Sequence, residues 1–179
     1  MEKLKQLFFN ESLRHWHFED LVQESGLSRE RVNCFLKTLL KEKLISRVKP
    51  RGKMPYSVAN REFPRFREQK RLCGLQKLVE AGLFEYISSL PEVKTAIIFG
   101  SFSRGDWNKS SDVDIFIYGN SKNFAKKTFE NKLKREIQLF SFEDPHEIQK
   151  ELDPALIPNI IKGFNVKGSL EPFEVSIRA

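Results

Sequence analysis

Hydrophobic residues in the first 60 positions recur at helical spacing and then at strand spacing. Apolar positions three and four apart predict one helix from about residue 2 to residue 10, and a short second helix that begins near Phe18 and ends at Gly26. Ser28 suits an N-cap, and it precedes an apolar stripe at i, i+3, i+4, i+7 and i+8 that begins at Val32 and predicts a third helix. Two β-prone runs, 44–48 and 54–58, flank a basic Pro/Gly turn and predict a hairpin.

The pattern after residue 60 mixes strands with helices. Pro64 is expected to open a helix, and nearly continuous apolar runs predict strands at Val93–Phe99 and Val113–Tyr118. Further helices are expected at 123–134, 145–151 and 154–162, and further strands at 134–140, 164–168 and 173–177. The predicted fold class is therefore α+β, with a mixed sheet and flanking helices in the second part of the chain.

Three helices followed by a hairpin predict a winged helix-turn-helix domain at residues 1–60. The third predicted helix has a polar face, which suits reading of the DNA major groove, and the hairpin turn offers cations for backbone phosphates. The residues predicted to contact DNA are Ser28, Arg29, Asn33, Lys37, Lys49, Arg51 and Lys53. The same pattern also fits a helical packing module with a solvated basic face.

The distribution of charge separates the two parts of the chain. The whole chain has 31 Lys+Arg against 24 Asp+Glu, a formal net charge of +7. Residues 1–75 hold 17 basic and 9 acidic residues, a net of +8, and residues 76–179 hold 14 and 15, a net of −1. The prediction of a nucleic-acid partner is therefore confined to the first 75 residues.

Composition excludes several classes of protein. Two cysteines exclude a disulfide scaffold and an all-thiolate zinc site. No apolar run is long enough for a bilayer, and the first residues do not resemble a secretory leader, so no membrane partner and a cytoplasmic location are expected.

Residues with a chemical role gather between the two predicted strands. Gly100 allows a tight turn and close approach of a phosphate, and Ser101 offers a hydroxyl and an amide at a helix start. Asp112 and Asp114 lie two apart on a strand, so both side chains leave the same face. Two carboxylates placed in this way can hold Mg²⁺ ions for an in-line displacement at phosphorus.

The string Gly-Ser-x-x-Arg-Gly, five further residues and Ser-Asp-x-Asp resembles the signature of the polymerase-β-like nucleotidyltransferases, and looks most like the minimal members. The resemblance implies Mg²⁺ or Mn²⁺ at the aspartates and a nucleoside triphosphate, ATP foremost, as cofactors. It implies nucleotide binding by Gly100, Ser101, Arg104, Gly105 and Ser111. A P-loop is excluded because no Gly-Lys-Ser/Thr follows Gly105. The other interpretation is a Gly-rich turn followed by an acidic edge strand.

The family pattern has a third carboxylate on a later strand, and here the match departs from it. The best alignment places Gln138 at that position, and Gln cannot accept a proton. Glu136, two residues earlier on the same predicted strand face, is the candidate for catalysis and metal binding in its place. The alternative is an exposed Glu at the start of the strand.

The whole arrangement resembles winged-helix-fused minimal nucleotidyltransferases, with a winged helix at 1–60, linker helices at 61–90 and a nucleotidyltransferase domain at 91–179. We expect a Mg²⁺-dependent transfer of a nucleoside monophosphate to an acceptor hydroxyl, with double-stranded DNA bound through residues 1–60. A protein acceptor or toxin partner and a homodimer are further expected options. The alternative is a weak or inactive enzyme that acts as a DNA-binding transcriptional regulator or antitoxin-like protein and uses the second fold to bind nucleotide or a partner.

Overall fold

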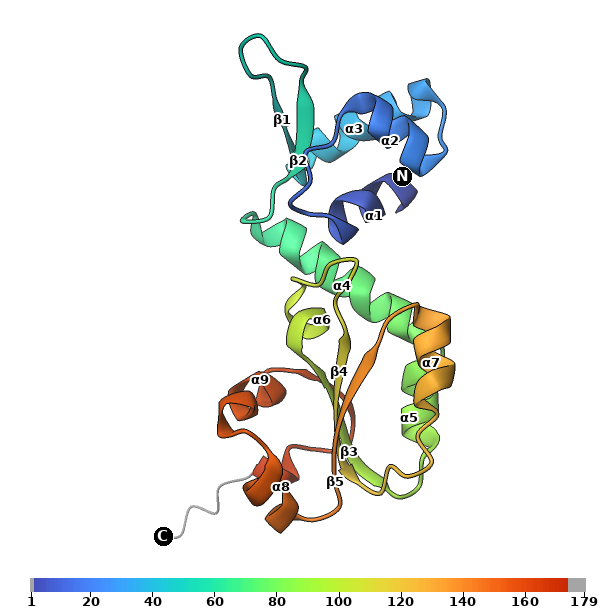
Figure 1. Cartoon of the computed structure of the whole chain (residues 1–179), viewed down its shortest axis with the longest axis vertical. Coiled ribbons are helices and arrows are strands. Elements are labelled where there is room, and N and C mark those ends of the chain that lie inside the picture. Colours follow the sequence, from blue (N-terminus) through green and yellow to red (C-terminus); the bar gives the residue numbers. More distant parts are fainter. Residues whose placement is uncertain (1, 174–179) are drawn as a thin grey trace. The chain divides into compact units, whose positions relative to one another are not determined.

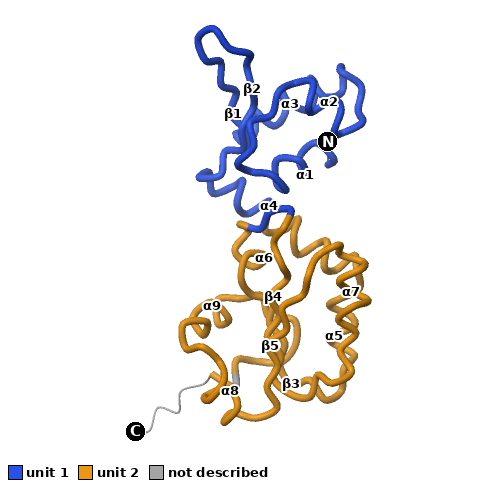
Figure 2. Tube along the Cα trace, in the orientation of Figure 1, with its two compact units in different colours: residues 1–70, 107–109 blue, residues 71–106, 110–179 orange. Residues whose placement is uncertain are grey.

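The computed structural model describes residues 2–173, and the chain divides into two compact units. Unit 1 comprises residues 1–70 with 107–109, and unit 2 comprises residues 71–106 with 110–179 (Figure 2). Helix α4 (Pro64–Glu80) contains the first boundary between them. The boundaries predicted from the sequence, 1–60, 61–90 and 91–179, stay a prediction.

The described residues of unit 1 form three helices, a two-stranded antiparallel sheet and the start of α4 (Figure 1). Its elements before α4 are α1 (Glu2–Asn10), α2 (Phe18–Ser25), α3 (Arg29–Lys41), β1 (Ile45–Val48) and β2 (Tyr56–Ala59). The helices and the hairpin predicted for the first 60 residues are therefore present. Their assignment to the winged-helix fold stays a prediction.

Local sequence explains where these helices start and stop. Gly26 takes the left-handed conformation (φ 62°) that ends α2, and the Ser28 hydroxyl accepts a hydrogen bond from the Arg31 N–H at the start of α3. Trp16 pairs with Ser57 through two backbone hydrogen bonds of 2.9 and 2.8 Å, which extends the hairpin by one bridge. The buried side chain of Trp16 therefore ties the segment before α2 to β2.

Residues 107–109 complete unit 1 although they lie far along the chain. Trp107 is fully buried, its indole N–H donates to the Lys70 carbonyl at 3.0 Å, and its ring lies 6.4 Å from that of Phe9. The Lys70 ammonium lies 5.2 Å from the centre of the Trp107 ring and donates to the Ser12 hydroxyl at 2.7 Å. The loop between the two halves of the glycine–aspartate motif thus contributes a core residue to unit 1.

Unit 2 is built on a four-stranded mixed sheet in the order β5-β4-β3-β6. Strand β3 is antiparallel to both of its neighbours, and β4 and β5 are parallel. The strands are β3 (Val93–Phe99), β4 (Val113–Gly119), β5 (Ile137–Phe142) and β6 (Phe164–Lys167). The helices are the end of α4, α5 (Leu83–Ser89), α6 (Gly100–Arg104), α7 (Lys126–Leu133), α8 (Pro145–Glu151) and α9 (Ile157–Ile161), with 3₁₀ turns η1 (Pro154–Leu156) and η2 (Glu171–Phe173). This confirms the predicted α+β class with a mixed sheet and flanking helices.

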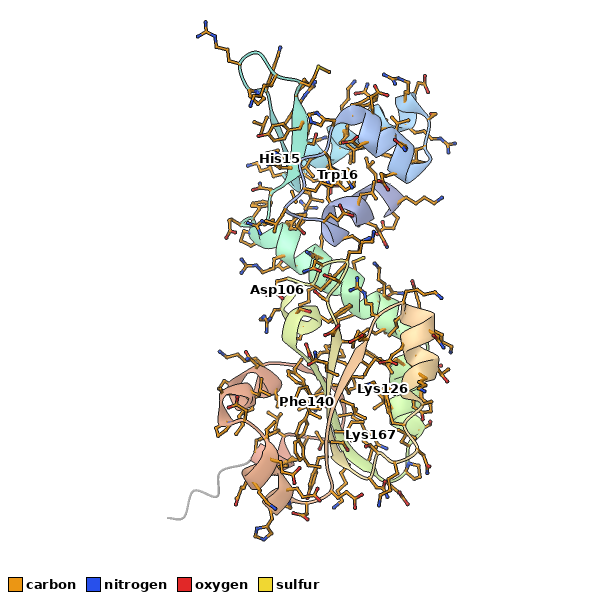
Figure 3. All side chains as sticks on the ribbon, viewed as in Figure 1. His15, Trp16, Asp106, Lys126, Phe140 and Lys167 are labelled. Atoms are coloured by element: carbon orange, nitrogen blue, oxygen red, sulfur yellow. The ribbon has the colours of Figure 1, made fainter. Side chains whose placement is uncertain are left out.

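Helices cover both faces of this sheet. Figure 1 shows α5 and α7 on one side and α8 and α9 on the other. On the second side a buried cluster joins β3, β4 and β5 to Ile148, Leu152 and Ile160, and Phe140 packs against it (Figure 3). Because side chains alternate along a strand, the residues that continue this face beyond the cluster are Asp114 and Gln138.

Three predicted elements after residue 60 differ by more than one residue from those observed. The helix expected at 123–134 begins at Lys126, and the one expected at 154–162 is a 3₁₀ turn followed by α9. The strand expected at 134–140 begins only at Ile137, because Lys134 adopts a positive φ of 54° that ends α7. The strand expected at 173–177 falls almost wholly outside the described residues. Within residues 2–173, no helix has the length and apolarity needed to span a membrane.

Candidate functional site

The turn between β3 and α6 brings the backbone against a carboxylate. Gly100 has a φ of 66°, and a Cβ built on it would lie 2.0 Å from Oδ2 of Asp114. A side chain at this position would therefore be strained and would also displace the carboxylate. The next residue, Ser101, donates its backbone N–H to Asp114. Gly100 and the backbone amide of Ser101 thus position Asp114, which is one reason for the glycine at the end of β3.

Asp112 and Asp114 lie at the start of β4, one before the strand and one within it. Burial raises the pKa of Asp114 above its ordinary value, and the neighbouring charge of Asp112 raises it further. The charge of Arg104 and the Ser101 amide act in the opposite direction. Two half-buried carboxylates whose charges repel each other form a site that a divalent cation would stabilise.

Gln138 is the residue of β5 that meets these carboxylates. It stands opposite Asp114 in the parallel register of β4 and β5, and its side-chain amide donates to Oδ2 of Asp112 at 2.7 Å. Which of Gln138 and Glu136 takes the place of the third carboxylate stays a prediction.

Glu136 is not part of the strand, which corrects the expectation that it shares a strand face with Gln138. Its side chain is exposed, and its carbonyl accepts from the Val113 N–H at 2.9 Å just before β5 begins. Among the described residues, no three His, Cys, Asp or Glu side chains form a group that could hold a metal ion. The role of Glu136 as third carboxylate therefore has no support from the geometry and stays a prediction.

The other predicted nucleotide-binding residues lie along the chain between this turn and Asp112. Arg104 is exposed at the end of α6 and pairs with Asp106 at 3.1 Å. Gly105 adopts a φ of 79° and ends the helix by donating its N–H to the Ser101 carbonyl at 2.9 Å. The carbonyl of Ser111 accepts a hydrogen bond of 2.6 Å from Arg135.

The side chains gathered at the start of β4 and β5 supply some of the oxygen ligands that a divalent metal needs. Asp112 and Asp114 supply two anionic oxygens, and the side-chain amide of Gln138 carries a neutral oxygen of the kind that Mg²⁺ also accepts. At the point of closest approach, Gly100 places no side chain of its own against the Asp114 carboxylate.

In unit 1, the predicted DNA-contacting residues of α3 have different surroundings. Asn33 and Lys37 are exposed and lie four residues apart, on one face of the helix. Arg29 is exposed as well, but it pairs with Glu19 at 2.6 Å and lies 5.1 Å from the centre of the Phe18 ring. Ser28 is exposed, and its hydroxyl serves as the N-cap.

The basic turn of the hairpin is exposed. Lys49, Arg51 and Lys53 all lie in the segment between β1 and β2, and Gly52 provides the left-handed turn with a φ of 69°.

Two residues of the motif region have roles that sequence reasoning missed. Arg135 holds the Ser111 carbonyl, one residue before Asp112, and Trp107 anchors the loop between Gly105 and Ser111 in unit 1. The one available signal was Trp107 itself, an aromatic residue in an otherwise polar stretch. Nothing in the sequence marked Arg135.

Comparisons with known proteins give a family and a few distant likenesses. Residues 81–177, just over half of the chain, match the model of the nucleotidyltransferase domain family. No curated protein matches the chain. A crystal structure described as a toxin–antitoxin with AMP-PNP is similar at 18% identity, covering 54% of this chain and 74% of that chain, with a TM-score of 0.36. Two mutant structures of the toxin–antitoxin MntA-HpeT are similar at 15% and 17% identity, covering 56% and 54% of this chain and 75% and 71% of those chains, with TM-scores of 0.34 and 0.32.

Proposed function

Because the chain belongs to the nucleotidyltransferase domain family, we propose that it transfers a nucleoside monophosphate from a nucleoside triphosphate, ATP foremost, to an acceptor hydroxyl. Pyrophosphate leaves as the new phosphoester bond forms. The observation that carries this proposal is the pair Asp112 and Asp114 at the start of β4, with the Ser101 amide donating to Asp114.

In this proposal the turn after β3 binds the triphosphate. Gly100 has no side chain to keep phosphate oxygens from the backbone, and Ser101, whose backbone N–H donates to Asp114, offers its hydroxyl to the same phosphates. Arg104 supplies a cation for the phosphates. Gly105 and Ser111 stand at the two ends of the loop that joins the two halves of the motif. The exposed guanidinium of Arg104 exchanges its pairing with Asp106 for one with the nucleotide.

Asp112 and Asp114 hold the divalent metal, Mg²⁺ or Mn²⁺, in this proposal. The metal supplies charge stabilisation for the attacking and leaving oxygens of the displacement. Glu136 is the proposed base for the acceptor hydroxyl, and it must approach the carboxylates from its exposed position before β5.

The experiment is an incubation of the purified full chain with each labelled nucleoside triphosphate, with Mg²⁺ and with EDTA. We expect metal-dependent labelling or pyrophosphate release by the wild type, and loss of both in Asp112→Asn plus Asp114→Asn. Glu143→Gln, which changes an exposed carboxylate beyond the end of β5, is the matched control and should keep wild-type turnover. No turnover with any nucleotide, or turnover that survives the double substitution, would contradict the proposal.

We further propose that unit 1 is a winged helix that binds double-stranded DNA. The order of its elements, three helices and then a hairpin, is the order of that fold. The exposed pair Asn33 and Lys37 would face base edges, and the cations between β1 and β2 would contact phosphates. The formal net charge of +8 in residues 1–75 attracts the negatively charged phosphate backbone of DNA.

The DNA proposal is tested by titrating a duplex at several salt concentrations. Each of Lys49→Gln, Arg51→Gln and Lys53→Gln should reduce the slope of log K against log salt by about 0.9, because each removes one phosphate contact. Lys3→Gln on α1, also exposed, is the control and should leave the slope unchanged. A wild type that binds no duplex at low salt would make unit 1 an interaction module with a solvated basic face.

One observation favours a second function, a weak or inactive enzyme that acts as a transcriptional regulator or antitoxin-like protein. The hydrogen bond from Gln138 to Asp112 places an amide where a catalytic carboxylate is expected, and an amide cannot take a proton from an acceptor. In this reading the second unit binds nucleotide or a partner, either a toxin or a second copy of the chain. Gln138→Glu distinguishes the two. A gain in turnover of tenfold or more assigns the wild type to the weak enzymes, and unchanged or lower turnover favours Glu136 as the base.

A further inference from the structure

Unit 2 contains a cleft of about 520 Å³ that the proposed chemistry does not use. Three helices contribute to it, namely the end of α4, α6 and the end of α7. The residues that line it are Lys77, Glu80, Ala81, Phe102, Lys132, Leu133 and Arg135. Its volume lies within the range of about 300–1,000 Å³ that small-molecule sites occupy.

Positive charge dominates the lining of this cleft. The lining includes three cations, Lys77, Lys132 and Arg135, and one carboxylate. That carboxylate, Glu80, accepts a hydrogen bond from the Gln76 amide at 3.0 Å. Burial is the main cause that lowers the pKa of Lys77, and the nearby charge of Arg135 acts in the same direction, whereas Cys73 and Glu80 act in the opposite direction. An anion in the cleft would compensate both the lost hydration and the repulsion between these two cations.

The remaining lining is apolar and close to a planar cation. The Arg135 guanidinium lies 5.2 Å from the centre of the buried Phe102 ring, and Ala81 and Leu133 complete the wall. The Lys132 ammonium donates to the Ala81 carbonyl at 3.2 Å, which holds it at the rim. A cleft lined by both cations and apolar groups suits a ligand that combines phosphates with a less polar body.

The cleft is separate from the carboxylates. None of Asp112, Asp114 and Gln138 lines it. Arg135 is nevertheless linked to the motif, because it donates to the Ser111 carbonyl at 2.6 Å and its charge interacts with that of Asp112. A ligand that engages Arg135 would therefore alter the electrostatic surroundings of Asp112.

We propose that this cleft binds the phosphate groups of a small phosphorylated molecule, at a site distinct from the carboxylate pair. A small ligand is favoured over a nucleic acid because the three cations converge on one cleft within unit 2. Binding there requires neither a divalent metal nor turnover. The proposal of this second site is therefore tested independently of the transfer reaction.

The test is isothermal titration of the full chain with inorganic pyrophosphate and with 5′-AMP, in EDTA and low salt. We expect saturable binding by the wild type and equal affinity for Asp112→Asn plus Asp114→Asn. Lys132→Gln should weaken binding at least tenfold, and Lys77→Gln plus Lys132→Gln about a hundredfold, because each charge-assisted contact is worth about a factor of ten or more. Lys127→Gln, an exposed lysine on α7 outside the cleft, is the matched control and should bind like the wild type.

Each other outcome overturns the proposal. No binding by the wild type at millimolar ligand, or equal binding by the lysine variants, removes the site. Loss of binding in the double Asn variant, with the lysine variants unaffected, assigns the phosphates to the carboxylate region. Tenfold tighter binding of a dT12 oligonucleotide than of pyrophosphate, with the same dependence on Lys132, identifies a nucleic-acid site in place of a small-molecule site. Lys132 is exposed, so its substitution tests the proposal even if Lys77→Gln impairs folding.

Discussion

Gly100→Ala tests most sharply how the turn after β3 serves the carboxylates. An alanine there must adopt a φ near 66°, and its Cβ would lie 2.0 Å from Oδ2 of Asp114, where real Cβ atoms stay beyond about 3.0 Å. The carboxylate must therefore move by about 1 Å, away from the Ser101 N–H that now donates to it.

The structure allows the strain of the backbone to be separated from the displacement of Asp114. Gly82 has a φ of 76° with no atom within 4 Å of a built Cβ, so Gly82→Ala carries the strain alone. We expect each substitution to cost about 1–2 kcal/mol for the left-handed backbone, and Gly100→Ala about 1.5 kcal/mol more for the lost hydrogen bond. Turnover should fall about 100-fold in Gly100→Ala alone, because a reacting group displaced by 1 Å costs about that factor.

The assay measures thermal unfolding and metal-dependent pyrophosphate release on both variants. Gly82→Ala should unfold a few degrees below the wild type and keep its turnover, whereas Gly100→Ala should lose turnover far beyond its loss of stability. The reasoning is refuted if the two variants have turnover within threefold of each other.

Three further substitutions test the fold around the site. Trp107→Ala should destabilise unit 1 by about 3–5 kcal/mol, because it empties a fully buried position. A urea unfolding curve, with hydrogen exchange of the α1 amides as the probe of unit 1, would detect the loss, and unchanged exchange in α1 would contradict it. Ser28→Ala should cost about 0.5–2 kcal/mol through loss of the cap on the Arg31 N–H, and circular dichroism would show a lower unfolding midpoint; an unchanged midpoint would contradict the cap. Gly163→Ala should cost about 1–3 kcal/mol, since its Cβ would lie 2.7 Å from the Ile98 carbonyl oxygen in β3. Thermal unfolding measures this, and a variant as stable as the wild type would show that the backbone shifts there at little cost.

Local patterns were sufficient to predict most elements of this fold. The start of α3 follows from Ser28, and the end of α2 from Gly26, because caps act within a few residues. Strands β3 and β4 follow from short apolar runs rich in β-branched residues, which favour a buried strand over a helix. The start of β5 could not be predicted, because Lys134 takes a left-handed conformation that its residue type does not signal.

For the candidate site, the sequence could predict only those features that depend on the spacing of residues along the chain. Asp112 and Asp114 share a face because they are two residues apart, and Gly100 is required because of a contact that comes from β4. The choice between Gln138 and Glu136 depends on the register between β4 and β5, a long-range property. The place of Trp107 in unit 1 is likewise a long-range packing result that no local pattern encodes.

The central claim is that Asp112 and Asp114 together hold a divalent metal for the chemistry. Titration of Mn²⁺ into the full chain, followed by electron paramagnetic resonance of the free ion, measures this directly. The account predicts saturable binding that is tightened by a nucleoside triphosphate and is abolished in Asp112→Asn plus Asp114→Asn, while Glu143→Gln binds like the wild type. Binding that survives the double substitution, or a wild type that binds no Mn²⁺ even with nucleotide present, would contradict the account.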